Sequence, residues 1–312
     1  MNILILGGAG FIGTNLTFTL AREKNNTITL FDKEFIDFSH ITKLGFGNIS
    51  IVKGSFDLES DFVKITAHQD VVYHLVSTTV PTTSNQKIAE ELMANVVTTS
   101  KFLDACVKNK VKKVMFLSSG GTVYGKEKVV PLNEDTTTNP ISSYGIQKIT
   151  IEKLLYLYQY LYGLDYRVVR LANPYGPYQR PNGVLGAVTT FTYKALKHEA
   201  ITVYGDGSVV RDFLFIDDAV RGILNILNSN NQNRVFNLGS GKGTSIKEVI
   251  ETIQEALDLE IDIQYVPGRK VDVPINILDI GLYEGCFGKF NPLSLKEGVL
   301  RTAEFMRKVY KI

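Results

Sequence analysis

Two side chains that could transfer a proton, Tyr144 and Lys148, stand four residues apart in a segment, residues 141–162, whose pattern predicts a helix. This spacing places both side chains on one face of the helix. A phenol with its ordinary pKa near ~10 is a poor base at neutral pH, but a neighbouring ammonium stabilises the phenolate and lowers that pKa. The pair could therefore act as a proton acceptor. Tyr and Lys also meet by chance on exposed helices, so this interpretation needs support from the rest of the chain.

The overall composition argues against several classes of function. Lys and Arg (34) nearly balance Asp and Glu (32), which gives no indication of binding to nucleic acid or to an anionic membrane. Cys106 and Cys286 lack metal-ligand spacing, and the four His form no zinc motif, so we expect no metal. The apolar start lacks a basic leader and no apolar run could span a bilayer. We therefore expect a cytoplasmic protein with reduced thiols and no membrane insertion.

Short apolar runs alternate with helical patterns through the first half of the chain. They predict strands at residues 3–6, 28–31, 49–52, 71–76, 114–118 and 167–171. Helical spacing, for example at residues 89–108, fills most of the intervening segments. Strands that are buried on both faces and separated by helices are typical of the α/β class with a Rossmann-type, doubly wound parallel sheet.

After Asn173 the pattern becomes less regular, which predicts a second, smaller α/β lobe that binds substrate. A helix at residues 217–227 and a strand at 235–239 still resemble parts of the main sheet. We therefore expect residues 1–173 and roughly 205–240 to form the Rossmann domain. Residues of roughly 174–204 and 241–312, with helices at 245–257 and 295–310, would form the second lobe. The two lobes would be interleaved in sequence, with a cleft between them.

The segment that follows the first predicted strand is rich in glycine and opens a helix. It contains Gly7, Gly10, Phe11, Ile12 and Gly13. Glycines permit a tight turn and let backbone N–H groups approach a pyrophosphate at the helix N-terminus. Asp32 ends the second strand, where its carboxylate can accept hydrogen bonds from a ribose diol and would repel a 2′-phosphate. The sequence therefore predicts a dinucleotide site that prefers NAD to NADP.

With the glycine loop, Asp32 and the Tyr144–Lys148 pair in this order, the chain resembles the extended short-chain dehydrogenase/reductase family over nearly its whole length. Within that family it is similar to the NAD-dependent nucleotide-sugar epimerases and dehydratases, such as the UDP-glucose 4-epimerases. Gly54-Ser-Phe-Asp57 looks like the segment whose Asp binds the adenine amino group. The resemblance implies further cofactor contacts from Leu58, Leu75, Asn95, Ser118, Tyr144 and Lys148.

The resemblance also implies a site for a nucleotide-diphosphate sugar, most often a UDP-sugar. Arg170-Leu-Ala-Asn173 matches a substrate-contacting turn, and Tyr204-Gly-Asp-Gly-Ser-Val-Val-Arg211 matches a nucleotide-sugar signature. In the family, the equivalents of Arg211 and Arg269 meet the diphosphate, and that of Asp272 meets the nucleotide ribose. Guanidinium groups suit phosphate oxygens, and a carboxylate can hold a diol. A lipid-linked sugar diphosphate stays open as an alternative substrate.

The chain departs from the family at a position that normally carries a Ser or Thr bonded to the reacting hydroxyl. Aligned on Val123-Tyr-Gly125, that position is Gly120. Either a nearby hydroxyl takes its place, or the Tyr144–Lys148 pair works without one. Thr122 is the first candidate for a replacement hydroxyl and Ser119 the second, while a purely structural Thr122 is an equal alternative. Dehydratases of the family carry Asp-Glu in place of Gly121-Thr122, and decarboxylases carry Glu at the position of Thr122. A threonine hydroxyl cannot replace a carboxylic acid in water elimination.

The resemblance therefore favours a nucleotide-sugar 4-epimerase acting on UDP-glucose and UDP-galactose. Asn276 stands where a bulky Tyr restricts family members to plain hexoses, which suggests room for UDP-GlcNAc and UDP-GalNAc. The alternatives are an NAD(P)H-dependent 4-ketoreductase, a 4,6-dehydratase, and a non-catalytic NAD-sensing protein. The resemblance also implies a homodimer that forms through the predicted helices at residues 89–108 and 142–162.

Overall fold

The computed structural model describes residues 1–79, 81, 84–127, 129–181, 186–268 and 273–312. Arg269 and Asp272, which the resemblance places at the substrate, lie outside the described residues.

A seven-stranded parallel sheet forms the centre of the larger part of the molecule, in the order β10-β6-β5-β4-β1-β2-β3. Its strands are β1 (Asn2–Leu6), β2 (Thr27–Asp32), β3 (Ile49–Lys53), β4 (Val71–His74), β5 (Lys113–Ser119), β6 (Asp165–Leu171) and β10 (Val235–Leu238). The strands predicted from apolar runs are confirmed. Four consecutive residues of β1, Ile3 to Leu6, have no exposed surface. Such burial requires that helices cover both faces of the sheet.

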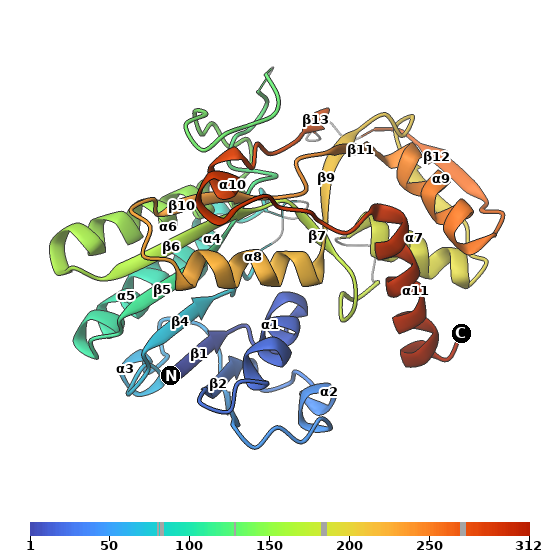
Figure 1. Cartoon of the computed structure of the whole chain (residues 1–312). Helices are drawn as coiled ribbons and strands as arrows, with labels where there is room; N and C mark the ends of the chain where they lie inside the picture. The colour runs from blue at the N-terminus through green and yellow to red at the C-terminus, as the bar shows by residue number, and fades with distance from the viewer. Residues whose placement is uncertain (80, 82–83, 128, 182–185, 269–272) are drawn as a thin grey trace.

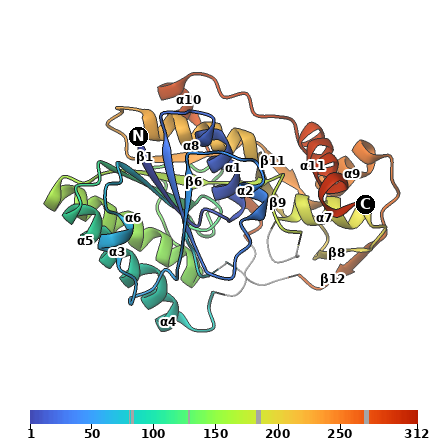
Figure 2. The ribbon, with the colours of Figure 1, turned by 90° about the horizontal axis from the view of Figure 1, so that it is seen from below.

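Two layers of helices provide that cover, and Figure 2 shows α1 and α8 on one side of the sheet and α5 and α6 on the other. The first layer contains α1 (Phe11–Ala21), α2 (Ser39–Thr42), α8 (Ile216–Asn228) and α10 (Gly281–Phe287). The second contains α3 (Phe62–Ile65), α4 (Ile88–Leu92), the π-helix η1 (Met93–Val97), α5 (Thr98–Lys108) and α6 (Ser143–Tyr162). The predicted Rossmann-type α/β fold is therefore confirmed.

The helix predicted at residues 89–108 is confirmed as a helical segment from Ile88 to Lys108, in which the π-helical turn η1 lies between α4 and α5. The wider turn carries Asn95 in its middle, and the Asn95 side chain bonds the loop after β4. A π-helical turn of this kind frequently lies at a functional site. Apolar spacing alone does not distinguish it from an α-helix.

Two smaller sheets lie beyond β6 in the chain. One contains β7 (Asn173–Tyr175), β9 (Val210–Phe215), β11 (Gly243–Ser245) and β13 (Ile275–Asn276), and the other pairs β8 (Ile201–Tyr204) with β12 (Ile263–Val266). The helices α7 (Ala187–Leu196), α9 (Ile246–Leu257) and α11 (Leu295–Tyr310) pack against one another beside them (Figure 1). Residues 205–240 were expected in the Rossmann domain, but β9 in this range pairs within the smaller sheet. The rest of the range agrees with the expectation, because α8 packs on the main sheet and β10 is one of its strands. The division into two lobes stays a prediction, and these pairings place β9 with the second lobe.

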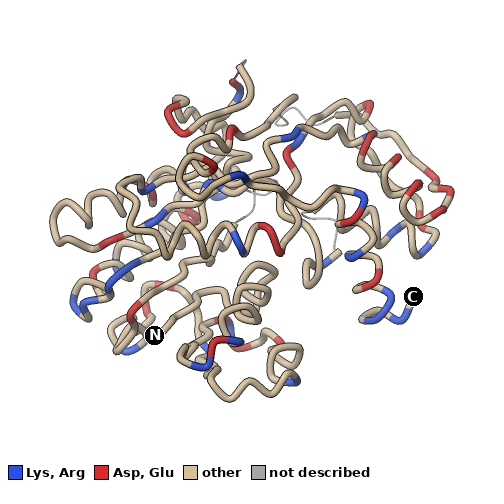
Figure 3. Tube along the Cα trace, in the orientation of Figure 1, with Lys and Arg blue, Asp and Glu red and all other residues tan. Residues whose placement is uncertain are grey.

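Charged residues of both signs alternate along the chain trace (Figure 3). The last turn of α11 carries charges of one sign, with Arg307 and Lys308 close in sequence to Lys311. No helix among the described residues combines the length and the apolar character that a membrane crossing requires.

Candidate active site

The glycine loop between β1 and α1 has no room for side chains. Gly7 adopts a φ of +81°, which favours glycine, and a Cβ on Gly13 would lie 2.3 Å from the Gly7 carbonyl oxygen. Gly10 caps α1 without any side-chain hydrogen bond, so the first-turn N–H groups of the helix have no side-chain acceptor there. A loop of this shape brings backbone N–H groups close to an anionic group, as a dinucleotide pyrophosphate requires.

Asp32 lies at the end of β2 and faces the same loop. Its Oδ2 accepts a hydrogen bond from the Ala9 N–H at 3.1 Å, and its Oδ1 accepts one from the Lys33 N–H at 2.9 Å. A carboxylate oxygen can accept more than one hydrogen bond, so the side chain retains lone pairs for a ribose diol. The loop and Asp32 therefore fit an NAD molecule.

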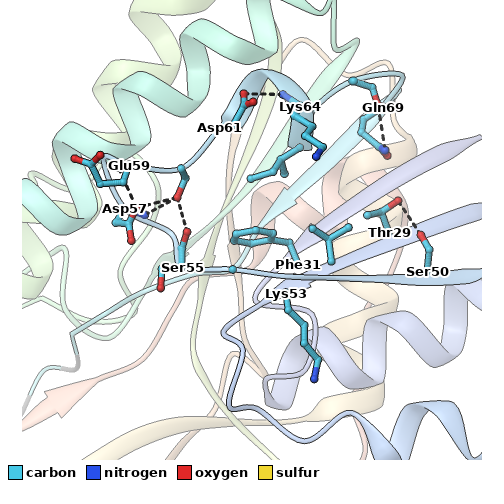
Figure 4. Close-up of a pocket in the computed structure, with 15 residues that line it drawn as sticks. Thr29, Phe31, Ser50, Lys53, Ser55, Asp57, Glu59, Asp61, Lys64 and Gln69 are labelled. Atoms are coloured by element: carbon cyan, nitrogen blue, oxygen red, sulfur yellow. Dashed lines mark hydrogen bonds between the residues drawn. The ribbon is translucent and has the colours of Figure 1, made fainter.

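A pocket of about 540 Å³ lies along one face of β2 and β3 and includes Asp57. In Figure 4, Asp57 and Glu59 lie at one end of the pocket, Thr29 and Ser50 at the other, and the Phe31 ring between them. The Asp57 Oδ1 accepts hydrogen bonds from the Ser60 hydroxyl and the Glu59 N–H, both at 3.0 Å. These two bonds fix the orientation of the Asp57 carboxylate, and its contact with the adenine stays a prediction.

Three other residues that the resemblance assigns to the cofactor make contacts within the protein. Leu58 is not among the pocket-lining residues, and its carbonyl accepts a hydrogen bond from Lys101. Leu75 lies behind the glycine loop, where its N–H bonds the Leu6 carbonyl at 3.1 Å. The Asn95 amide bonds the Thr78 N–H at 2.9 Å and the Thr78 hydroxyl at 2.8 Å. We infer that Asn95 supports the loop after β4, and these bonds leave its amide little capacity to contact a cofactor directly.

A second cavity, of about 640 Å³, joins the cofactor loop to the predicted substrate residues. Among the residues that line it are Phe11, Ile12, Ser118, Ser119, Tyr144, Asn173, Tyr204 and Arg211. These residues come from α1, β5, α6, β7, β8 and β9, so the cavity lies where the main sheet meets the smaller ones. The structure therefore brings these separately predicted side chains to one cavity.

The Tyr144–Lys148 pair projects from the first turns of α6 toward the end of β5. Ser142 caps this helix by accepting a hydrogen bond from the Gly145 N–H at 3.2 Å. Tyr144 lines the cavity, while Lys148 is buried and donates to the Leu117 carbonyl at 2.9 Å. The Lys148 Nζ lies 5.4 Å from the centroid of the Tyr144 ring. The predicted spacing on one helical face is therefore realised.

The electrostatics of the pair differ from the expectation for exposed groups. Burial raises the pKa of Tyr144 to about 12. Burial also lowers the pKa of Lys148 to about 8, and the Glu152 carboxylate opposes that shift. The expected lowering of the phenol pKa by the ammonium is therefore outweighed in this structure, because desolvation disfavours both charged forms.

The missing hydroxyl at Gly120 has a steric explanation. A Cβ on Gly120 would lie 2.5 Å from the Leu278 Cδ1 and 3.1 Å from the Arg170 carbonyl oxygen. Ser119 lines the cavity with Tyr144, whereas Thr122 does not, and the Thr122 hydroxyl is buried without a hydrogen-bond partner among the described residues. The cavity therefore favours Ser119 over Thr122 as the replacement hydroxyl, and this order stays a prediction.

The substrate end of the cavity contains only part of the predicted set. Asn173 donates to the Asp212 carbonyl at 2.9 Å, and the Arg211 Nη1 donates to the Val273 carbonyl at 2.6 Å. Asn276 is 1% exposed, donates to the Gly120 carbonyl at 3.1 Å and is not among the cavity-lining residues. The expectation that Asn276 opens space for an N-acetyl group is therefore not supported, because the side chain faces the turn after β5.

Comparison with known proteins identifies the family. Residues 3–239 match the NAD dependent epimerase/dehydratase family. The chain belongs to this family. Its cofactor is NAD, for which the glycine loop and Asp32 provide the fit described above.

The relatives of this epimerase/dehydratase family member catalyse more than one reaction. A UDP-glucose 4-epimerase from Thermotoga maritima, solved with UDP-glucose, has 34% identity and a TM-score of 0.92, covering 99% of this chain and 100% of that one. A UDP-glucuronic acid 4-epimerase from Bacillus cereus, solved with UDP-glucuronic acid and NAD, has 26% identity and a TM-score of 0.90, covering 99% and 100%. A UDP-N-acetyl-alpha-D-glucosaminuronate decarboxylase from Bacillus cytotoxicus is 32% identical over 98% of both chains.

Sequence reasoning overlooked several polar residues of this family member's cavity. Thr190, Lys194 and Thr202 line it from α7 and β8, and Gln179 lines it from the preceding loop. These residues lie in the irregular part of the chain, where no spacing pattern links them to the motifs. The buried Glu152 was also overlooked, although it stands four residues after Lys148 on the same helical face.

Proposed function

We propose that this protein is an NAD-dependent nucleotide-sugar 4-epimerase whose substrates are UDP-hexoses. One observation carries the proposal: a single cavity is lined by Phe11 and Ile12 of the cofactor loop, by Tyr144, and by Arg211. A proton acceptor therefore lies between a dinucleotide site and a guanidinium that can bind a diphosphate.

In the proposed mechanism, the Tyr144 phenolate removes the proton of the sugar 4-hydroxyl and later returns it. Lys148 holds positive charge near the phenol, and the Ser119 hydroxyl bonds the reacting oxygen. Arg211 retains the diphosphate while the oxidised sugar turns to present its other face. The chemistry that NAD supplies when bound is reversible hydride transfer at C4. Its positive ring charge would also offset the free-energy cost of burying a phenolate. The cofactor is unchanged after each turnover.

The residues after β5 favour epimerisation over the related reactions. Water elimination needs a carboxylic acid beside the sugar, and this chain has Gly121 and Thr122 where the dehydratases carry two acids. The same Thr122 replaces the Glu of the decarboxylases. A 4-ketoreductase would use the same Tyr144 and Lys148 but would consume a reduced cofactor.

A substrate panel tests this proposal. The purified protein would be incubated with UDP-, dTDP- and GDP-sugars without added reductant, and the products resolved by chromatography. We expect interconversion of UDP-glucose and UDP-galactose with no change in the NADH absorbance. Loss of water, release of CO₂ or consumption of NAD(P)H would each reject epimerisation and identify the competing reaction. UDP-GlcNAc in the panel tests whether the sugar site accepts the N-acetyl group.

Replacement of Tyr144 by Phe tests the proton acceptor. We expect the variant to retain bound NAD and to lose turnover by at least about 10³-fold, because the general base is absent. Near-normal activity in this variant would reject the assignment.

We also propose that two copies of the chain associate through α5, η1 and α6. Large apolar side chains on these helices are exposed, among them Tyr156, Leu157, Tyr160 and Leu161 of α6 and Met93 and Val97 of η1. Several exposed apolar side chains on one group of helices are typical of a protein–protein interface. The cytoplasmic location and a role in polysaccharide biosynthesis stay predictions as well, and cell fractionation would test the first.

A further inference from the structure

Behind the cavity, a buried ion pair joins α6 to β6. The Glu152 carboxylate accepts from the Arg170 Nη2 at 2.8 Å and from the Arg170 Nε at 3.2 and 3.3 Å. Glu152 is 5% exposed and Arg170 is 6% exposed. α6 packs against β5 and β6, which lie beside it in Figure 1. A bidentate pair removed from water in this way holds both groups in one geometry.

The same carboxylate also reaches the cavity wall. The Ser118 hydroxyl donates to the Glu152 Oε1 at 2.5 Å, and Ser118 lines the cavity. A hydroxyl has one proton to donate, so this bond leaves Ser118 only its acceptor lone pairs for a ligand. Glu152 thus connects Arg170, which does not line the cavity, to Ser118, which does.

Glu152 stands one helical turn beyond Lys148, which stands one turn beyond Tyr144, so the three share a face of α6. Lys148 is buried, with its Nζ over the Phe116 ring at 4.8 Å and one hydrogen bond to the Leu117 carbonyl. An ammonium in such surroundings tends to lose its proton. A negative charge one turn away opposes that loss, and its effect is large where the dielectric is low.

The other charged or titratable groups near Lys148 do not replace Glu152. His74 of β4 is buried, and burial lowers its pKa to about 3, so it stays neutral at physiological pH. The Tyr144 phenol is neutral until its pKa, about 12, is approached. Arg170 carries a positive charge, which would disfavour the ammonium. Glu152 is the group that raises the pKa of Lys148 against the effect of burial.

We propose that Glu152 is a positioning residue that keeps Lys148 protonated and fixes the hydrogen-bond direction of Ser118. The proposal rests on the proposed function, in which the charge of Lys148 is required at the phenol. Arg170 holds the carboxylate in place from β6. The buried ion pair therefore has a role in the proton transfer in addition to its role in packing.

The variant Glu152→Gln removes the charge and preserves the shape, and Glu152→Asp is the matched control that preserves the charge and changes the geometry. The readout is the pH profile of kcat/KM for sugar interconversion by the full chain with NAD bound. Because activity requires protonated Lys148, kcat/KM should fall at high pH as Lys148 loses its proton. This alkaline limb of the profile therefore follows the titration of Lys148. We expect Glu152→Gln to move the limb to lower pH by about one unit or more, and Glu152→Asp to leave it near the parent.

A limb that stays in place in Glu152→Gln, or that moves equally in Glu152→Asp, would reject the proposal. If Glu152→Gln does not fold, the double variant Glu152→Gln/Arg170→Met removes both charges and avoids an unpaired guanidinium. A downward shift is again expected from it, but a smaller one, because removal of the guanidinium acts in the opposite direction.

A second measurement separates this proposal from the proposed function. Urea unfolding against pH gives the free energy of unfolding of the parent protein and of its Lys148→Met variant. The difference between the two changes with pH where Lys148 titrates. In the Glu152→Gln background this transition should move to lower pH, whether or not the protein converts any sugar. An unmoved transition would reject the role of Glu152. A wild-type protein that converts no nucleotide sugar would reject the proposed function alone.

Discussion

Leu278 occupies the space that a side chain on Gly120 would need, since a Cβ there would come within 2.5 Å of the Leu278 Cδ1. Leu278 is fully buried and lies two residues after Asn276, whose amide bonds the Gly120 carbonyl at 3.1 Å. The segment after β13 thus closes over the position where relatives carry a hydroxyl. Either another hydroxyl therefore bonds the reacting oxygen, or the Tyr144–Lys148 pair works without one.

A serine at position 120 should therefore destabilise the protein rather than restore the family pattern. We expect Gly120→Ser to lower the free energy of unfolding by about 1–3 kcal/mol, the usual cost of overpacking. In a Leu278→Ala background the same substitution should cost less, because the space is open. Urea unfolding of the two single variants and the double variant measures this coupling. Equal costs in both backgrounds would contradict the steric explanation.

Ser119, rather than Thr122, should be needed for turnover. We expect Ser119→Ala to lower kcat by about 10²-fold, because a hydrogen bond to the reacting oxygen is lost. Thr122→Val should leave kcat within about threefold of the parent and leave stability unchanged or improved, because its buried hydroxyl has no partner among the described residues. Steady-state kinetics on both variants checks this, and the reverse ranking would restore Thr122 as the candidate.

The buried ammonium of Lys148 should make the cofactor-free protein more stable as the pH rises from about 8 to 10.5. Burial lowers the pKa of Lys148 from 10.5 to about 8, so the unfolded chain binds one more proton than the folded protein in this range. The shift corresponds to a gain on the order of 3 kcal/mol, at ~1.4 kcal/mol per pKa unit. Urea unfolding measured against pH, relative to Lys148→Met, isolates this contribution. A stability difference that is constant across the range would contradict it.

The cofactor loop should not tolerate a methyl group at Gly13. We expect Gly13→Ala to weaken NAD binding by at least about tenfold, or ~1.4 kcal/mol, because its Cβ would collide with the Gly7 carbonyl at 2.3 Å. Gly285→Ala is the matched control, since no atom lies within 4 Å of the Cβ it would add. Titration calorimetry measures both affinities. Unimpaired binding by Gly13→Ala would mean that the loop can open without cost.

The exposed apolar face of α6 should hold two copies together. We expect Leu157→Glu/Leu161→Glu to yield monomers, because two charges would be buried in the proposed interface. Leu300→Glu, which changes an exposed apolar residue of α11, should leave the assembly intact. Sedimentation velocity distinguishes the two masses. A wild-type chain that sediments as a monomer would reject the proposed dimer.

The positions of the main elements could be predicted from local patterns. The run Ile3 to Leu6 predicts a strand covered on both faces, and the spacing in 295–310 predicts the helix α11 at the bounds that the structure shows. The π-helix η1 and the pairing of β9 with the smaller sheet were missed. The pairing of β9 joins segments that are distant in the chain, and within η1 the Asn95 side chain accepts a hydrogen bond from the loop after β4.

The sequence by itself determined the fold class, the glycine loop with Asp32, and the Tyr144–Lys148 pair, because each depends on spacing within one or two neighbouring elements. Only the tertiary structure decided which hydroxyl enters the cavity, where Asn276 points, and in which direction burial shifts the pKa of the pair. It also joined Glu152 to Arg170 and Ser118 across three elements. These features depend on which side chains are excluded from water and on contacts between segments far apart in the chain, and no local pattern records either.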